Sequence, residues 1–408
     1  MVKKSWNTSS FDKLAKVYRG GSPRPIQAYI TDSPSGINWI KIGDVRPGDK
    51  YITTTAEKII PEGVSRSRKV FTGDFILSNS MSFGRPYILK IDGCIHDGWL
   101  TIQDYQDSFD VDFLYYLLSS EEVMKQYIAM AAGSSVKNLN KEKVSSLIVT
   151  YPDKTEQIKI ATALSDIDAL VSDLEKLIEK KKNIRQGAMQ ELLTGKKRLP
   201  GFSGEWEQVE LADLCYLITK QTGFDYSETI KPSLKTEEGL DTYPFIQNKD
   251  FQGFTVNYNT DFYVPHEIAK RFPRITLDEK CLLISISGRI GNVGVYPGKR
   301  TAFVGGAVGV AKFKDKDWID WCMMFLCSKD GQEQIFLHEK VGAQHNLTVE
   351  DVRHLKILLP PKNEAASILQ IIKDIDGEIE ASQKKLSKYI AIKQGMMQKL
   401  LTGEIRLV

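Results

Sequence analysis

The stretch "QGAMQELLTG" at residues 186–195 recurs almost letter for letter as "QGMMQKLLTG" at 394–403. The offset between the two, 394 − 186 = 208 residues, aligns other parts of the chain as well. "DID" at 166–168 falls on "DID" at 374–376. Self-similarity at a fixed offset indicates an internal repeat, and a repeat of this length decides the architecture before any motif does.

The match continues upstream of the quoted stretches. "NLNKEKV" at 138–144 falls on "NLTVEDV" at 346–352, and with a slightly smaller offset Trp6 falls on Trp206. The chain therefore consists of two tandem copies of one unit of about 200 residues. Such a repeat is typical of a molecule with approximate two-fold symmetry.

The first part of each copy predicts an α+β domain. Helical stretches are expected at 111–131 and 317–340. Between them lie short β-branched or aromatic runs bounded by Gly, Pro, Asp and Asn, which are typical of strands. These runs are "WIKIGDV", "DFILSNS", "YILKI" and "SSLIVTYP" in the first copy, and "KCLLISIS", "NVGVYPG", "GGAVGVAKF" and "HLKILLP" in the second.

The second part of each copy predicts a long helix. Apolar residues alternate at spacings of four and three, as in a coiled-coil seam. The helix that carries the first seam is expected to span residues 156–194, which is about 58 Å at a rise of about 1.5 Å per residue. We expect the two helices to pack antiparallel on each other; a coiled coil between separate chains is the alternative. The seam residues are Ile160, Leu164, Ile167, Val171, Leu174 and Ile178, then Ile368, Ile372, Ile375 and Ile379, with Ser382 in place of Leu174.

Composition bounds the class of protein. The 408 residues carry a net charge of only +3, which leaves room for a local DNA-binding surface but not for a protein that coats nucleic acid by charge alone. There is no long apolar run for a membrane span and no apolar core of a signal peptide, so we expect a cytoplasmic location. The five cysteines lack CxxC spacing, which predicts reduced thiols and no metal site.

Motifs for catalysis are missing from the sequence. It contains no GxxxxGK[ST] phosphate-binding loop, and its five histidines form no HExxH pattern. We therefore predict no catalytic residues and no cofactor bound by this chain. A self-contained DNA enzyme is the interpretation that this absence disfavours.

The chain resembles the specificity (S) subunit of type I restriction–modification systems. The resemblance rests on the two "LLTG…RL" endings, on "GSSVKNL" at 133–139 and "GAQHNL" at 342–347, and on the openings at Trp6 and Trp206. It covers essentially the whole chain. It implies a non-catalytic subunit in which two globular target-recognition domains each read half of an asymmetric, bipartite DNA site. The long helices are then expected to set the spacing between the half-sites.

The resemblance also implies domains and partners. The expected domains are a target-recognition domain at 1–153, a helical spacer at 154–199, a second target-recognition domain at 200–361 and a second helical spacer at 362–408. The expected partners are double-stranded DNA, two methyltransferase subunits docked on the helices and, through them, restriction subunits. S-adenosylmethionine is expected in the methyltransferase. A coiled-coil scaffold that spaces two protein partners without touching DNA is the alternative.

Candidate contact residues follow from side-chain chemistry, since Arg, Lys, Asn and Gln in loops are the usual DNA-contacting groups. The DNA candidates are Arg66, Arg68, Lys69, Asn79, Ser80, Arg85, Lys137 and Asn138 in the first copy, and Lys270, Arg271, Arg274, Arg289, Lys299, Arg300, Gln344, His345 and Asn346 in the second. Apolar residues near the helix ends are candidates for docking the methyltransferase, with packing inside the chain as the alternative. They are Met189, Leu192, Leu193, Met396, Met397, Leu400 and Leu401.

Overall fold

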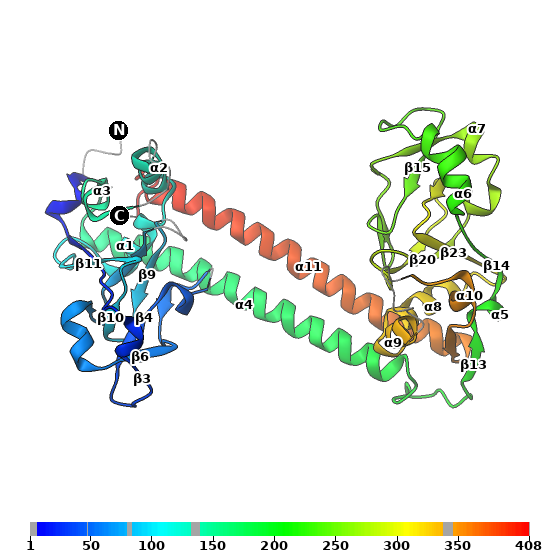
Figure 1. Ribbon diagram of the computed structural model, residues 1–408, viewed down its shortest axis with the longest axis horizontal. Helices are drawn as coiled ribbons and strands as arrows, with labels where there is room; N and C mark the ends of the chain where they lie inside the picture. Colours follow the sequence, from blue (N-terminus) through cyan, green and yellow to red (C-terminus); the bar gives the residue numbers. More distant parts are fainter. Residues whose placement is uncertain (1–5, 47, 80–83, 132–138, 338–345, 408) are drawn as a thin grey trace. The chain divides into compact units, whose positions relative to one another are not determined.

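The computed structural model describes residues 6–46, 48–79, 84–131, 139–337 and 346–407. The chain divides into two compact units. Unit 1 combines Met1–Lys176 with Gln383–Val408, and unit 2 is Leu177–Ser382. Each unit holds a body of sheets and short helices together with parts of two long helices, α4 (Lys154–Leu192) and α11 (Lys362–Leu400) (Figure 1). The four-part division expected from the sequence is finer and stays a prediction.

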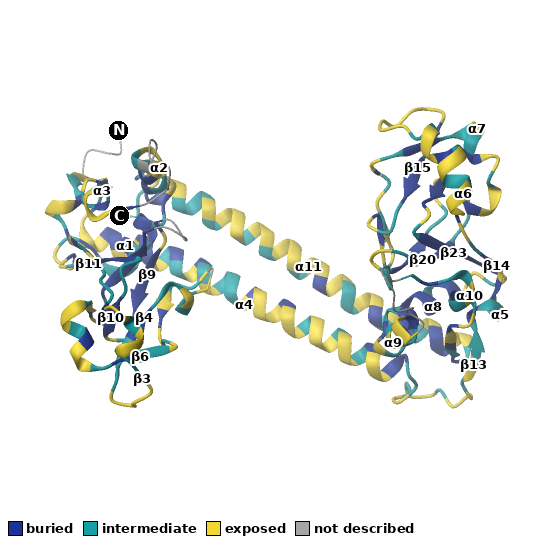
Figure 2. Ribbon diagram, viewed as in Figure 1, coloured by how far each residue is buried: buried dark blue, intermediate teal, exposed yellow. Residues whose placement is uncertain are grey.

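Unit 1 contains two five-stranded sheets. The first has the order β3 (Ile30–Thr31), β6 (Glu57–Ile59), β4 (Ile37–Ile40), β10 (Gly93–Ile95) and β7 (Arg68–Val70). The second has the order β2 (Lys16–Arg19), β11 (Trp99–Gln103), β8 (Phe75–Ser78), β9 (Pro86–Leu89) and β5 (Tyr51–Ile52). Every residue of β8 and β9 is buried, so these strands are covered on both faces; β9 is drawn in the colour of buried residues in Figure 2. That burial explains why they read as continuous apolar runs.

Short helices pack on the second sheet of unit 1. They are α1 (Val111–Leu118), α2 (Glu121–Ala131) and α3 (Lys141–Ser145). Asp110 caps α1, since its carboxylate accepts hydrogen bonds from the main-chain N–H groups of Asp112 and Phe113. Phe113 then joins one apolar core with Phe75 of the sheet. A separate pair of antiparallel strands, β1 (Asn7–Ser10) and β12 (Ile148–Tyr151), brings the two ends of the body together.

Unit 2 repeats this plan with four-stranded sheets. One has the order β14 (Cys215–Lys220), β23 (Val308–Phe313), β20 (Cys281–Ser285) and β21 (Val293–Tyr296); the other has the order β18 (Tyr263–Pro265), β15 (Thr242–Ile246), β22 (Ala302–Val304) and β19 (Thr276–Leu277). Two further pairs are β13 (Glu207–Glu210) with β24 (Lys356–Leu359), and β16 (Phe251–Gln252) with β17 (Thr255–Val256). The short α-helices of unit 2, within the described residues, are α5 (Leu211–Leu214), α6 (Gly223–Asp225), α7 (His266–Ala269), α8 (Trp318–Cys327), α9 (Lys329–Leu337) and α10 (Val349–Arg353).

The internal repeat is visible in strand order. The run β14–β23–β20–β21 of unit 2 matches the run β2–β11–β8–β9 of unit 1, and β13–β24 matches β1–β12. The predicted α+β class is confirmed. The helical stretch expected at 111–131 contains α1 and α2, the one expected at 317–340 contains α8 and α9, and each predicted β run overlaps a strand. The helix expected at 156–194 is α4, which begins and ends within two residues of the prediction.

Within each unit, a segment of α4 runs antiparallel to a segment of α11. In unit 1, Lys393 Nζ lies 2.5 Å from Asp168 Oδ1, and Leu400 shares a core with Ile160 and Leu164. In unit 2, two ion pairs show that the segments of α4 and α11 are again antiparallel. They join Lys181 to Glu378 and Arg185 to Asp376.

A buried ion pair, here called the joint, ties the end of one long helix to the start of the other inside each unit. In unit 1, Arg406 Nε donates to Glu156 Oε1 at 2.6 Å, and the guanidinium lies 5.6 Å from the ring centroid of Trp6. This hydrogen bond holds the pKa of Glu156 below its usual value. Gly403 has a φ of +71°, and a Cβ there would lie 3.2 Å from the Trp6 ring. The turn that delivers Arg406 to Glu156 therefore favours glycine.

The joint of unit 2 has the same construction. Arg198 donates to both oxygens of Glu364, at 2.6 and 2.7 Å, and lies 5.5 Å from the ring centroid of Trp206. Trp206 Nε1 also donates to Glu364 Oε2 at 3.1 Å. Gly195, with a φ of +69°, takes the place of Gly403. The repeated "LLTG…RL" letters thus encode a glycine turn and the arginine that closes the joint.

Candidate nucleic-acid interface

Polar residues gather at the ends of β8 and β20, two strands that occupy corresponding places in the two units. The main-chain N–H of Leu139 donates to Asn79 O just after β8, and that of Leu347 donates to Ile286 O just after β20, both at 2.8 Å. Asn79 N–H in turn donates to Gly98 O at 3.1 Å, and Ile286 N–H donates to Ala307 O at 2.9 Å. These bonds mark the same place in both units. We call the surroundings the strand-end face of unit 1 and of unit 2.

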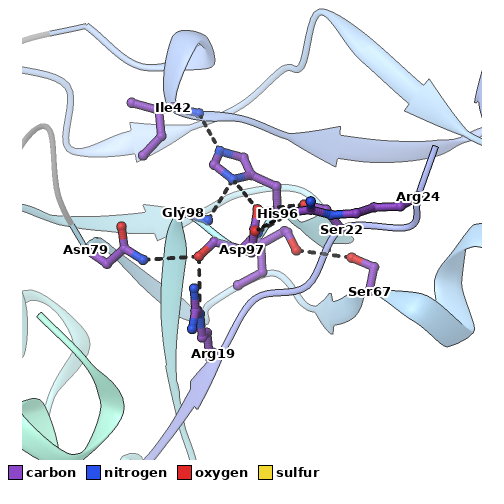
Figure 3. A network of polar contacts seen from close by, with 10 residues as sticks. Arg19, Ser22, Arg24, Ile42, Ser67, Asn79, His96, Asp97 and Gly98 are labelled. Atoms are coloured by element: carbon purple, nitrogen blue, oxygen red, sulfur yellow. Dashed lines mark hydrogen bonds and ion pairs between the residues drawn. The ribbon is translucent and has the colours of Figure 1, made fainter. Parts of the chain in front are cut away.

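The strand-end face of unit 1 is a closed polar network around Asp97 (Figure 3). The Asp97 carboxylate accepts from Ser22 Oγ at 2.8 Å and from an Arg24 guanidinium nitrogen at 3.3 Å. Its main-chain oxygen accepts from Asn79 Nδ2 at 3.1 Å and from Arg19 Nε at 3.4 Å. The hydrogen bond from Ser22 is the main reason why the pKa of Asp97 is lowered. The carboxylate therefore stays charged and holds the Arg24 side chain, while the main-chain oxygen of Asp97 holds Arg19.

His96 fixes the other side of this network. The main-chain N–H groups of Ile42 and Gly98 face its Nε2 and Nδ1 at 3.2 and 2.7 Å (Figure 3). A doubly protonated imidazolium would set N–H against N–H at both positions, so this geometry disfavours the charged ring. Burial also lowers the pKa of His96. The ring lines an open cleft of about 810 Å³ together with Arg24, Lys41 and Trp39.

Predicted residues of the first copy gather partly at this face. Asn79 belongs to the network itself, and Arg68 Nε donates to Arg19 O at 3.4 Å while its guanidinium covers the Tyr18 ring at 4.9 Å. Arg66 and Lys69 are exposed next to Arg68 in the sequence, and Lys69 lies on the edge strand β7 with it. These residues place positive charge along one border of unit 1.

Other predicted residues of the first copy are not placed at the face. Arg85 is exposed just before β9, and within the described residues no hydrogen bond or ion pair joins it to the Asp97 network. Ser80, Lys137 and Asn138 lie outside the described residues. Their assignment to DNA stays a prediction.

The strand-end face of unit 2 contains a cleft of about 500 Å³. Asn346, one of the predicted residues, lines it beside Gln221, Gln247 and Ser287. Gln221 exposes only 2% of its surface. In the part of the chain that the structure describes, neither amide atom of Gln221 has a hydrogen-bond partner, and Asn346 Oδ1 has none either. Buried amides are normally bonded, so this cleft is unusual.

Arg289 lines a neighbouring cleft of about 380 Å³ with Asn248 and Lys249. The two clefts are linked because Asn248 Nδ2 donates to Ser287 O at 3.1 Å. The remaining predicted cations of the second copy are exposed but line neither cleft: Lys270, Arg271, Arg274, Lys299 and Arg300. Of these, Lys270 is paired with Glu267 at 2.8 Å, and Arg300 is paired with Glu238. Gln344 and His345 lie outside the described residues.

Sequence reasoning missed Asp97, Ser22 and Gln221. The bond between Ser22 and Asp97 joins residues 75 positions apart, so no local pattern announces it. Gln221 comes directly after β14, which ends at Lys220, so the alternation of inward and outward side chains along the strand does not extend to it. Without that alternation a buried glutamine cannot be told from an exposed one.

The residues expected to dock a methyltransferase are packed inside the chain's own units. Met189, Leu192 and Leu193 belong to the core of unit 2, and Leu400 and Leu401 belong to that of unit 1. Met396 and Met397 are half-buried against the unit 1 core. The alternative of packing within the chain therefore describes these side chains, while docking on them stays a prediction.

The described ranges offer no cluster of three or more His, Cys, Asp or Glu side chains arranged to hold a metal ion. The cysteines are free, and burial raises the pKa of the Cys281 thiol to about 12, so it stays protonated. Nor does any helix in the described part of the chain have the length and apolar character for crossing a membrane.

Comparison with known proteins identifies one family. A family model described as "Type I restriction modification DNA specificity domain" matches residues 3–186 and again 203–388. The type I restriction enzyme EcoBI specificity subunit of Escherichia coli is 21% identical over 420 residues, covering 98% of this chain and 86% of that one. The type I restriction enzyme MjaVIII specificity subunit of Methanocaldococcus jannaschii is 23% identical over 378 residues, covering 88% and 83%.

Solved structures share the fold. A chain from a study of complex assembly and conformational transition of the type I R-M system has a TM-score of 0.64 at 16% identity, with 98% of both chains covered. The HsdS subunit from Thermoanaerobacter tengcongensis has a TM-score of 0.55 at 17% identity, again with 98% of both chains covered.

Proposed function

Because the chain belongs to the type I restriction–modification DNA specificity family, as a non-catalytic subunit for DNA recognition, we propose that its two units each read one half of a bipartite DNA site. The observation that carries this proposal is the pair of strand-end faces. They occupy corresponding places in the two units, yet their polar residues differ. Unlike residues at like positions favour two unlike half-sites, and hence an asymmetric target.

Two readers give the specificity that one cannot. A correctly read base pair contributes roughly 1–3 kcal/mol of discrimination. Contributions from separate half-sites add if the readers are held at a set distance, and a wrong spacing then prevents simultaneous contact. Recognition of two half-sites at a set distance therefore requires a stiff connection between the units.

The long helices supply this connection in our proposal. Both α4 and α11 have 39 residues, or about 58 Å at the usual helical rise. Support comes from the antiparallel pairing within each unit, from the alternating apolar seam, and from the buried joint that anchors each helix end. We propose that the two helices form an antiparallel coiled coil with pseudo-two-fold symmetry, and that this coiled coil sets the distance between half-sites.

Chemistry would then come from partners. We propose that two methyltransferase subunits dock on the helical spacers and that restriction subunits join through them. The methyltransferase would bind S-adenosylmethionine and accept the extruded adenine. This chain would supply the recognition of the DNA sequence, which agrees with the absence of catalytic motifs from its own sequence.

Co-expression with the cognate methyltransferase tests the proposal. The tagged chain should retain two methyltransferase copies, measured by the mass of the complex, and the complex should protect one bipartite duplex but not its scrambled version. Affinity should fall steeply with salt because phosphate contacts release counterions. Equal protection of the scrambled duplex would refute sequence reading. Binding of protein partners without salt-dependent DNA binding would favour a scaffold instead.

A further inference from the structure

The cleft at the strand-end face of unit 2 has the features of a ligand site. Gln221 is 98% buried, as its exposed fraction of 2% implies, yet both ends of its amide lack partners within the described ranges. A buried unpaired amide is costly, and folding alone would favour an apolar side chain of the same size. Its presence is explained if a ligand completes its hydrogen bonds.

The cleft gives that amide room to act. Gly306 lines it, and a Cβ at this position would come within 3.2 Å of Gln221 Oε1. A larger residue would therefore crowd the amide. Because no hydrogen bond to a described residue holds the amide inward, a side-chain rotation that turns it toward the cleft breaks no such bond. Asn346 brings a second unpaired acceptor to the same space.

The walls of the cleft indicate the class of ligand. Lys220 is exposed at the cleft, and no carboxylate is among the described residues that line it, so the local charge favours an anionic chain nearby. Tyr226 and Phe245, also in the wall, lie parallel with centroids 6.4 Å apart. Amides beside flat aromatic faces and a cation suit a nucleobase attached to phosphates.

We propose that this cleft receives the edge of one base of the half-site read by unit 2, and that Gln221 determines the identity of that base. The inference rests on the proposed function. An amide offers one donor and one acceptor, which pair with N7 and the exocyclic amine of adenine, so adenine is the favoured base. Asn346 is the neighbouring positioning residue, and Lys220 contacts the adjoining phosphate.

The test uses the full chain co-expressed with its methyltransferase, and the probe is the DNA of the expressing cells, in which modified adenines are mapped. The main variant is Gln221→Met, which keeps the length of the side chain and removes its hydrogen-bonding groups. The matched control is Gln208→Met, at an exposed glutamine of β13 in the same unit. The melting temperature of each purified chain is measured alongside.

The inference predicts that Gln221→Met relaxes one position of one half-site, with discrimination there falling roughly tenfold or more, while the other half-site is unchanged. The melting temperature should stay level or rise, because the lost amide had no partner. Gly306→Ala should weaken discrimination at the same position. Gln208→Met should change neither the motif nor the melting temperature.

Three outcomes would overturn the inference. They are an unchanged motif in Gln221→Met, loss of both half-sites together, and a melting temperature lowered by several degrees or failure to fold, which would make Gln221 a structural residue. The proposed function fails separately. It fails if the unsubstituted chain directs no bipartite motif, whatever Gln221 does.

Discussion

The joints of the two units and their strand-end faces differ in how much they share. In both joints an arginine donates to a buried glutamate at 2.6 Å beside a tryptophan. At the faces, Asp97 collects Ser22 and arginines in unit 1, whereas an unpaired Gln221 borders an open cleft in unit 2. One repeat therefore carries a constant part, the joint, and a variable part, the strand-end face. The contrast separates changes that affect stability from changes that affect specificity.

Exchange of an entire sheet body should have the largest effect. If residues 7–151 are replaced by the same region of a relative with a different target, we expect one half-site to be replaced completely and the other retained. The physical reason is that the strand-end face of unit 1 belongs wholly to that region. Mapping of modified adenines measures the result, and a change in both half-sites would show that reading is shared between the units.

Breaking the joint should cost stability in either unit by a similar amount. Glu364→Gln and Glu156→Gln each remove the charge of a buried glutamate that binds a half-buried arginine, so we expect the free energy of unfolding to fall by more than when an exposed ion pair is lost. Urea unfolding measures the loss. Asp173→Asn is the control, because Asp173 pairs with Lys176 on an exposed face at 3.4 Å and such pairs contribute roughly 0–1 kcal/mol. Equal losses in the joint and control variants would contradict a structural role for the joint.

Removing charge from the border of unit 1 should change affinity more than specificity. Arg68→Ala is expected to lower DNA affinity evenly across sequences and to reduce the salt slope by about 1, as loss of one phosphate contact does. Binding to the bipartite duplex at several salt concentrations measures this. Lys125→Ala, on α2 and paired with Glu121 at 2.7 Å, is the control and should leave the slope unchanged. An altered base preference in Arg68→Ala would assign it to base reading instead.

The two units should respond to pH in opposite directions through one histidine each, with the smallest effects. Burial lowers the pKa of His96, so the unfolded chain takes up a proton first and stability is lost as pH falls below about 6.5. The hydrogen bond to Glu210 raises the pKa of His354, so its contribution is present below about pH 6.5 and is lost as pH rises through the raised value.

Urea unfolding from pH 5 to 8 tests this pair. His96→Gln should flatten the loss of stability on the acid side, and His354→Gln should flatten the loss on the neutral side. The His354 effect should also shrink in high salt because that side chain is about half exposed. The same slope change in both variants would contradict the assignment.

Much of the architecture was predictable from sequence because periodicity reports burial directly. The seam through Ile160 and Leu164 and the apolar run of β8 both lie in buried cores, as their spacing indicates. The joint was visible only as repeated letters, since its partners Glu156 and Arg406 are 250 residues apart. The strand-end faces were harder to predict from the sequence. Their polar contacts are made across the fold, and Gln221 lies just beyond the end of β14, where strand alternation no longer indicates burial.

The most direct test of the central claim is a map of modified adenines in DNA from cells that express this chain with its methyltransferase. Two fixed readers with unlike faces predict a motif of two different half-sites, separated by a constant number of unspecified base pairs. A single continuous motif, a palindrome, or half-sites at variable spacing would contradict the account.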